Sequence, residues 1–220
     1  HPKRGTGAHD AIGLLPAFPG TALHDAYASY FTYTGCTHAL CGVHIQRELL
    51  FLAEEAGPAT AAWARPLRRA LETMRRATVA ARTAGQAALD ARTRRRYERR
   101  FAQLLAAGDA AEPPPTPAQP GWKPRRSPGG QLLVRLRKYR DAVLRFVHDL
   151  TVPCANSEAE RDLRMMKVGQ KVSGGFRTPH GAHTFCTLRS YLVTARKQGV
   201  AALVALRGAL TGAPFTPAVP

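Results

Sequence analysis

The chain has 220 residues and a formal net charge of +17 at pH 7, from 32 Lys and Arg against 15 Asp and Glu. A basic excess of this size favours a polyanionic partner, most often nucleic acid, and no apolar run approaches the length of a membrane span. Four cysteines are too few for a disulfide scaffold, and no signal-peptide pattern opens the chain, so we expect a reduced cytoplasmic protein. Because the chain opens at His1 rather than Met, we also expect a fragment or a processed chain.

The first 44 residues indicate an α/β arrangement. We predict a short helix over residues 8–15, a short β-strand over 21–24 and a further strand over 37–43. Asp25 follows the strand at 21–24, and open α/β sheets place ligands at the carboxyl ends of their strands. Asp25 is therefore a candidate site residue, although the same position suits a turn or a helix N-cap.

From Ile45 onwards the apolar residues repeat with helical spacing. The repeats before the proline-rich stretch are Ile45, Leu49 and Leu52, then Trp63, Leu67, Ala70 and Met74, then Tyr97, Phe101 and Leu104. After it, the repeat of Leu132, Leu136, Tyr139, Val143, Phe146 and Leu150 predicts one long amphipathic helix, and two further helices end near Gly199 and Leu210. We divide the chain into a first part of an α/β core (1–44), a helical insertion (45–112), a proline-rich loop (113–130), helices returning to the core (131–212) and a loose tail (213–220).

A dense basic run lies between Arg92 and Arg100 in the third helical segment. A solvated helix face is the simplest interpretation of such a run, and contact with DNA is the alternative.

The segment from Asn156 to Lys171 has the most informative charge pattern in the chain. In a helix, offsets of four, three and four residues align Glu160, Arg164, Lys167 and Lys171 along one face. One carboxylate in a row of cations suits a divalent metal beside a polyanion, since the carboxylate binds metal and the cations bind phosphates. The alternative is a capping box formed by Ser157 and Glu160.

His38, Cys41 and His44 are spaced three residues apart, with Cys36 nearby, and could bind zinc. If residues 37–43 form a strand, His38 and Cys41 point to opposite faces, which weakens a four-ligand site. The alternative is a buried cysteine and a hydrogen-bonded histidine where a strand passes into a helix.

Five segments together resemble a known family: HPKRG, LHDAYASY, HALCGVH, NSEAERDLRMMKVGQK and SGGFRTPHGA. From His1 to about Thr211 they are similar to the C-terminal part of insertion-sequence 66 family transposases, which are DDE enzymes with a ribonuclease-H-like core. The resemblance implies an incomplete core of this kind with a large helical insertion, Asp25 as the second catalytic Asp and Glu160 as the catalytic Glu. It also implies Mg²⁺ or Mn²⁺ at these carboxylates, and contact of Asn156, Arg164, Lys167 and Lys171 with DNA.

The same resemblance bears on zinc, on partners and on completeness. A C-x-x-H step follows the second Asp in several DDE groups and here matches Cys41 and His44. The implied partners are the element's ends, target DNA, further copies of the chain on DNA, and accessory proteins of the element. The implied location is the bacterial cytoplasm, in association with the nucleoid. The family's first catalytic Asp lies upstream of HPKRG, so we expect this chain to be unable to catalyse transposition by itself. A basic DNA-binding module without chemistry and a zinc-stabilised structural domain are the alternatives.

Overall fold

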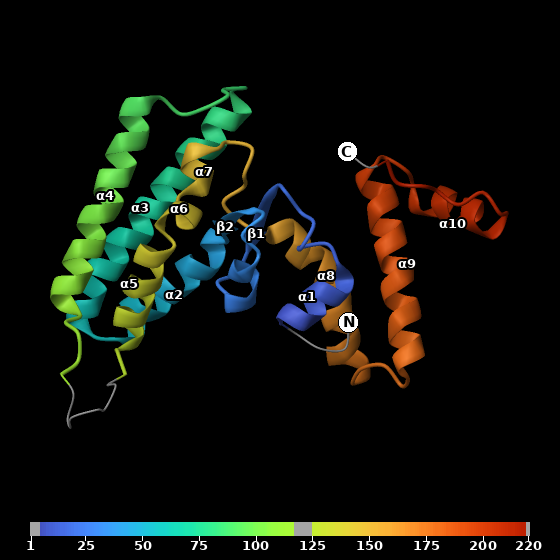
Figure 1. Cartoon of the computed structure of the whole chain (residues 1–220), viewed down its shortest axis with the longest axis horizontal. Helices are drawn as coiled ribbons and strands as arrows, with labels where there is room; N and C mark the ends of the chain where they lie inside the picture. Colours follow the sequence, from blue (N-terminus) through green and yellow to red (C-terminus); the bar gives the residue numbers. More distant parts are fainter. Residues whose placement is uncertain (1–4, 117–124, 219–220) are drawn as a thin grey trace. The chain divides into compact units, whose positions relative to one another are not determined.

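The computed structural model describes residues 5–116 and 125–218, and it divides the chain into two compact units (Figure 1). Unit 1 comprises His1–Asn156, and unit 2 comprises Ser157–Pro220. The structure is rich in helices and contains one small parallel sheet, so the predicted helix-rich α/β class is confirmed. The first four residues of the HPKRG segment lie outside the described residues.

The sheet of unit 1 pairs two short parallel strands, β1 (Thr21–His24) and β2 (Thr37–Leu40). Helix α1 (Thr6–Ile12) precedes β1, and the 3₁₀ helix η1 (Ala28–Thr32) lies between the strands. The strand predicted over 21–24 is confirmed, whereas β2 ends three residues before the predicted 43 because the next helix already begins at Gly42. Parallel pairing aligns the carboxyl ends of both strands, and Asp25 directly follows one of them.

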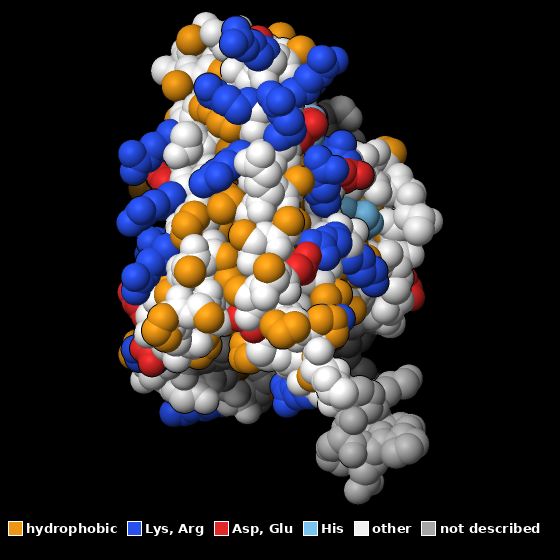
Figure 2. Space-filling model, turned by 90° about the vertical axis from the view of Figure 1, so that its left-hand side faces the viewer, with side chains coloured by type: hydrophobic (Ala, Val, Ile, Leu, Met, Phe, Trp, Pro, Cys, Tyr) orange, Lys and Arg blue, Asp and Glu red, His pale blue; other side chains and the backbone are white. Residues whose placement is uncertain are grey.

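Three long helices follow and supply most of the core of unit 1: α2 (Gly42–Glu55), α3 (Pro58–Thr83) and α4 (Ala91–Ala111). Their predicted apolar stripes are buried, with Leu49, Leu67 and Phe101 each at 0% exposure. Figure 1 shows α3 and α4 side by side. Figure 2 looks onto the α4 side of the molecule, and Lys and Arg side chains gather towards the end at which α4 begins.

The prediction of a single long helix from Leu132 to Leu150 is wrong, because this stretch forms three short helices. They are α5 (Pro128–Lys138), α6 (Arg140–Val143) and α7 (Arg145–His148). The breaks fall at Tyr139, with φ −110° and ψ 30°, and at Leu144, with φ −96° and ψ 6°. The Tyr139 ring stacks on Phe31 with centroids 3.8 Å apart, so a tertiary contact accompanies the first break. Five of the six residues of the predicted repeat are nevertheless buried, and Tyr139 is half-buried.

One carboxylate joins the two ends of the proline-rich segment in unit 1. Glu112 accepts hydrogen bonds from the hydroxyl of Thr60, at the start of α3, and from that of Ser127, 2.5 Å away. Ser127 also accepts from the Gly130 N–H at 2.9 Å and so caps α5. Residues 117–124 of the predicted loop lie outside the described residues.

Unit 2 contains α8 (Ser157–Ser173), α9 (Pro179–Lys197) and α10 (Ala202–Leu210). Lys197 forms an ion pair with Asp162 at 2.6 Å, which ties α9 to α8. The Tyr191 hydroxyl donates to the carbonyl of Ala205 at 3.0 Å, which ties α9 to α10. Among the described residues of both units, no helix is long and apolar enough to cross a membrane.

Candidate functional site

Asp25 lies at the carboxyl end of β1 and is half-buried. Its Oδ1 accepts a hydrogen bond from the backbone N–H of Tyr27 at 3.1 Å, so Asp25 also initiates a tight turn into η1. The turn and the site role are compatible, because a carboxylate that accepts one hydrogen bond keeps lone pairs for a cation. The turn orients the carboxyl group beside the end of the strand.

A histidine pair supports the strand end from within the sheet. His24, which is 4% exposed, lies with its Nε2 3.0 Å from Nδ1 of His38, and Nε2 of His38 lies 3.0 Å from the carbonyl of Tyr33. Because a carbonyl oxygen only accepts hydrogen bonds, His38 Nε2 donates to the carbonyl of Tyr33. Burial lowers the pKa of His24. The contact of His24 Nδ1 with the Asp25 carbonyl raises this pKa, and the nearby His38 lowers it, so the net shift is downward.

Aromatic side chains of the η1 segment cover this histidine pair. The Tyr30 ring stacks on His24 with centroids 4.6 Å apart, and Phe31 meets the same ring edge-on at 4.9 Å. The Tyr33 hydroxyl donates to Asp10 at 2.7 Å, and desolvation together with this hydrogen bond raises the pKa of Tyr33 to about 12. Asp10 thus fixes the position of the Tyr33 side chain, which directly follows η1, by a hydrogen bond.

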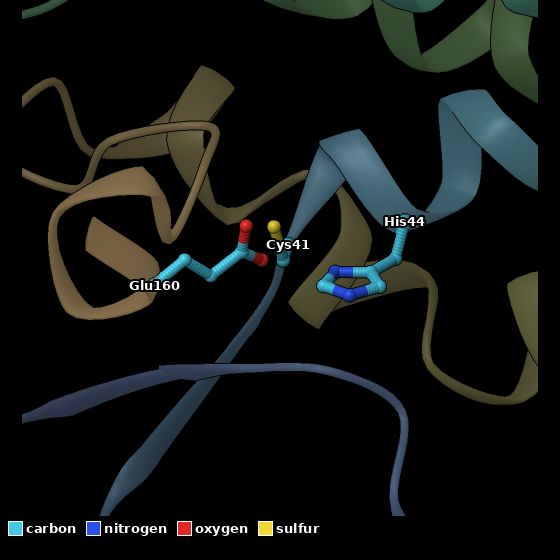
Figure 3. Close-up of side chains that lie close together, drawn as sticks. All are labelled: Cys41, His44 and Glu160. Atoms are coloured by element: carbon cyan, nitrogen blue, oxygen red, sulfur yellow. The ribbon is translucent and has the colours of Figure 1, made fainter. Parts of the chain in front are cut away.

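Cys41 and His44 lie at the start of α2, just after β2 (Figure 3). Cys41 is the N-cap residue and is 1% exposed, and its sulfur lies within 4.8 Å of a ring nitrogen of His44. A thiol and an imidazole this close fit two of the four positions of tetrahedral zinc. Cys36 and His38 belong to other contacts, since the Cys36 thiol and His38 Nε2 both reach the carbonyl of Tyr33. Zinc at Cys41 and His44 stays a prediction.

Cys154 lies against the same turn of backbone. Its carbonyl accepts from the N–H of Gly42 at 2.7 Å, and a Cβ on Gly42 would lie 2.6 Å from the Cys154 sulfur. Burial raises the pKa of the Cys154 thiol to about 11, with the nearby Cys41 adding to the shift. Because thiolates rather than thiols ligate metals, this cysteine fits a packing role.

In unit 2, Glu160 and the predicted cations lie on α8 (the Glu160 side chain is drawn in Figure 3). The helix runs without interruption from Ser157 to Ser173, so the offsets of four, three and four fall on one helix face. Glu160 is half-buried, and the cations beyond it are exposed: Arg164, Lys167 and Lys171. Asn156 directly precedes the helix, and Glu160 lies in its first turn.

Sequence reasoning missed the pairing of His24 with His38 and the role of Tyr33. The register of the parallel strands pairs Ala22 with His38 and His24 with Leu40, so both histidines lie diagonally on one face. Their pattern in the chain becomes informative only once this register is known.

The comparisons with known proteins identify one family. A model described as "Transposase IS66 family" matches residues 1–184, which is more than half of the chain. The match spans Asp25, Cys41, Glu160 and the basic row of α8. The chain therefore belongs to the IS66 family of transposases. No curated protein and no solved structure matches it.

Proposed function

We propose that this chain is part of the catalytic domain of a DDE transposase with a ribonuclease-H-like core, which cleaves DNA and transfers strands. The observation that carries the proposal is the position of Asp25, directly after a strand of a parallel pair, within the segment matched by the transposase family. Asp25 then serves as the second catalytic aspartate and Glu160, on α8, as the catalytic glutamate.

Each of these carboxylates fits a hard divalent cation. Mg²⁺ and Mn²⁺ take oxygen ligands, and Asp25 offers a carboxylate whose orientation is fixed by the Tyr27 N–H. When bound, such a metal lowers the pKa of an attacking water or hydroxyl and stabilises charge at the phosphorus centre. The chain's own part is to orient the carboxylates, and the hydrogen bond from the Tyr27 N–H does this for Asp25.

The basic row on α8 supports a role in binding the element's end. Arg164, Lys167 and Lys171 lie on the face that carries Glu160, and all three are exposed. Cations on a catalytic helix hold phosphates close to the carboxylate, with Asn156 at the start of the same helix as a further donor. The proposed partners are therefore DNA ends and target DNA, with self-association on DNA.

The test is to change each carboxylate to its amide in the complete gene product that contains this chain. We expect Asp25→Asn and Glu160→Gln to abolish Mg²⁺- or Mn²⁺-dependent nicking of a duplex carrying the element's end. DNA binding should stay largely intact, because the cations remain. Asp10→Asn is the matched control. Asp10 accepts a hydrogen bond from Tyr33 and has no proposed catalytic role, so this variant should keep its cleavage activity.

Two results would contradict the proposal. Equal loss of cleavage and DNA binding in Glu160→Gln would mean that Glu160 supports the helix rather than the chemistry. Salt-dependent DNA binding without any cleavage by the unaltered gene product would instead indicate a DNA-binding module.

A further inference from the structure

A second cationic surface lies in unit 1, on α3 and α4, far along the sequence from α8. The exposed arginines are Arg68 and Arg69 on α3 and Arg92, Arg95, Arg96, Arg99 and Arg100 on α4. Most of the predicted basic run of α4 is thus on the surface. Figure 2 shows Lys and Arg side chains gathered towards the end at which α4 begins.

The acidic side chains of these two helices are already engaged elsewhere. Glu72 is held by Arg75 and Arg76, each at 2.8 Å, and Glu98 faces His148 at 3.5 Å. Asp109 pairs with Arg137 of α5, and Asp90 accepts from the Thr93 N–H at 2.8 Å as the N-cap of α4. Among the described residues, therefore, none of the seven arginines has an acidic partner within ion-pair distance.

Four of these arginines line a hollow between the two helices, which we call the α3–α4 arginine groove. Its volume is about 700 Å³, and its cationic lining is Arg69 from α3 with Arg96, Arg99 and Arg100 from α4. Thr73 and Gln103 add hydrogen-bonding groups, while the buried Met74 and Tyr97 form an apolar floor. A second hollow, lined by Ala91, Arg92, Arg95, Glu98 and Arg99, shares Arg99 with the groove and lies nearer the start of α4; its one acid, Glu98, faces His148.

The charge arrangement is unfavourable for α4 alone. Arg92 with Arg96, Arg95 with Arg99, and Arg96 with Arg100 are like charges four residues apart, which destabilise a helix. Arg92 also lies in the first turn of the helix, where the helix dipole favours anions. A bound polyanion would relieve both effects.

We propose that the α3–α4 arginine groove binds the sugar–phosphate backbone of duplex DNA without reading its sequence. From Arg92 to Arg100 the helix rises about 12 Å, and phosphates on one strand follow each other every ~3.4 Å of helix axis, so the row spans roughly three to four phosphates. Guanidinium groups match phosphate oxygens with paired hydrogen bonds. The groove lies outside the proposed catalytic residues, so it adds a second DNA contact to the proposed function.

The test measures the salt dependence of DNA binding by fluorescence anisotropy, with the full chain and a labelled duplex that lacks any element end. In R96Q/R100Q, we expect the slope of log K against log salt concentration to fall by about 2, since each lost phosphate contact contributes ~0.9. The control R135Q/R137Q removes the same charge from α5, where both arginines are already paired with Glu48 and Asp109, and should keep the slope. R96K/R100K keeps the charges and should keep the slope as well.

Several outcomes would contradict the proposal that the α3–α4 arginine groove binds duplex DNA. They are an unchanged slope in R96Q/R100Q, a loss confined to duplexes that carry the element's end, or stronger binding to an RNA hairpin or to anionic lipid vesicles than to duplex DNA. Circular dichroism and thermal melting of R96Q/R100Q establish that the variant is folded. Failure here leaves the proposed function standing, because cleavage by the complete gene product is measured separately and depends on Asp25 and Glu160.

Discussion

Glu72 is the acid that neutralises part of the arginine-rich surface of α3. Arg75 donates to both of its oxygens and Arg76 to one, all at 2.8 Å. These hydrogen bonds lower the pKa of Glu72 to about 2 from the usual 4.5. Arg75 and Arg76 are thereby held along their own helix, while Arg68 and Arg69 are left to solvent.

The Glu72 cluster predicts a pH-dependent loss of stability. A depressed carboxyl pKa stabilises the fold above the unfolded pKa of about 4.5, and this contribution is lost as pH falls towards about 2. At pH 7 we expect Glu72→Gln to lower the free energy of unfolding by roughly 0.5–1 kcal/mol, the range of partly exposed ion pairs. Denaturant unfolding at pH 7 and at pH 2 measures this, and the difference from the unaltered protein should be much smaller at pH 2, where about half of the folded carboxyl groups are protonated.

The control for this prediction is Glu54→Gln on α2. Glu54 is exposed and has no ion pair among the described residues, so its change should have no such pH dependence. An equal effect of both substitutions would show that net charge, rather than the arginine pair, sets the stability.

At the scale of elements, the contact between α4 and α5 depends on a glycine. A Cβ on Gly108 would lie 2.6 Å from Cδ2 of Leu133 and 3.2 Å from the Trp63 ring. Both neighbours are buried, at 1% and 2% exposure, so neither moves away without disturbing the core.

We expect Gly108→Ala to destabilise the protein by about 1–3 kcal/mol, because overpacking outweighs the gain in helix propensity. The control is Gly169→Ala on α8, where a Cβ would meet Phe176 at an ordinary 3.9 Å. That change should instead stabilise its helix by about 0.5–1 kcal/mol. Thermal unfolding of the two variants checks the opposite signs, and a stabilising Gly108→Ala would mean that α5 can shift away from α4.

The elements differ in how well the sequence predicted them, for physical reasons. The turn residues around 21–24 and the periodic stripes of α2, α3 and α4 are local signals, and these elements appear as predicted. The breaks at Tyr139 and Leu144 carry no Gly or Pro, and the first coincides with stacking on Phe31, more than a hundred residues away. No local pattern contains such information.

In the candidate site, too, some features follow from local sequence signals and others depend on tertiary contacts. The row of α8 follows from spacing alone, because one helix contains all of its members. The pairing of His24 with His38 beside Asp25 depends on strand register, which sequence spacing does not determine. Assigning catalytic roles to Asp25 and Glu160 rested on the family resemblance.

At the scale of the whole molecule, the two units differ in how much they bury. The buried residues of the main hydrophobic core all lie between Leu40 and Leu150, within unit 1. In unit 2, the buried residues among those described are Ala195 and Ala205. Large apolar side chains there are exposed, among them Leu163, Val172, Leu203 and Leu210.

We therefore expect residues 1–156 to fold alone and residues 157–220 not to. Expressed separately, the first should unfold cooperatively and show dispersed amide signals in NMR spectra, because its core is complete. The second lacks enough buried apolar surface to offset the entropy of ordering its chain. A cooperative transition in the isolated 157–220 segment would contradict this, and would mean that its three helices pack more tightly than their exposure indicates.

The bonds that Glu112 makes with Thr60 and Ser127 have a consequence for how this protein can vary. The carboxylate of Glu112 bonds directly to Ser127, so the two residues that flank the segment between them are joined without it. Doubling the length of such a loop costs only about 0.6 kcal/mol in closure entropy. Insertions, labels or whole passenger domains placed between these two residues should therefore leave the helices on either side in register, and the segment is a natural entry point for engineering.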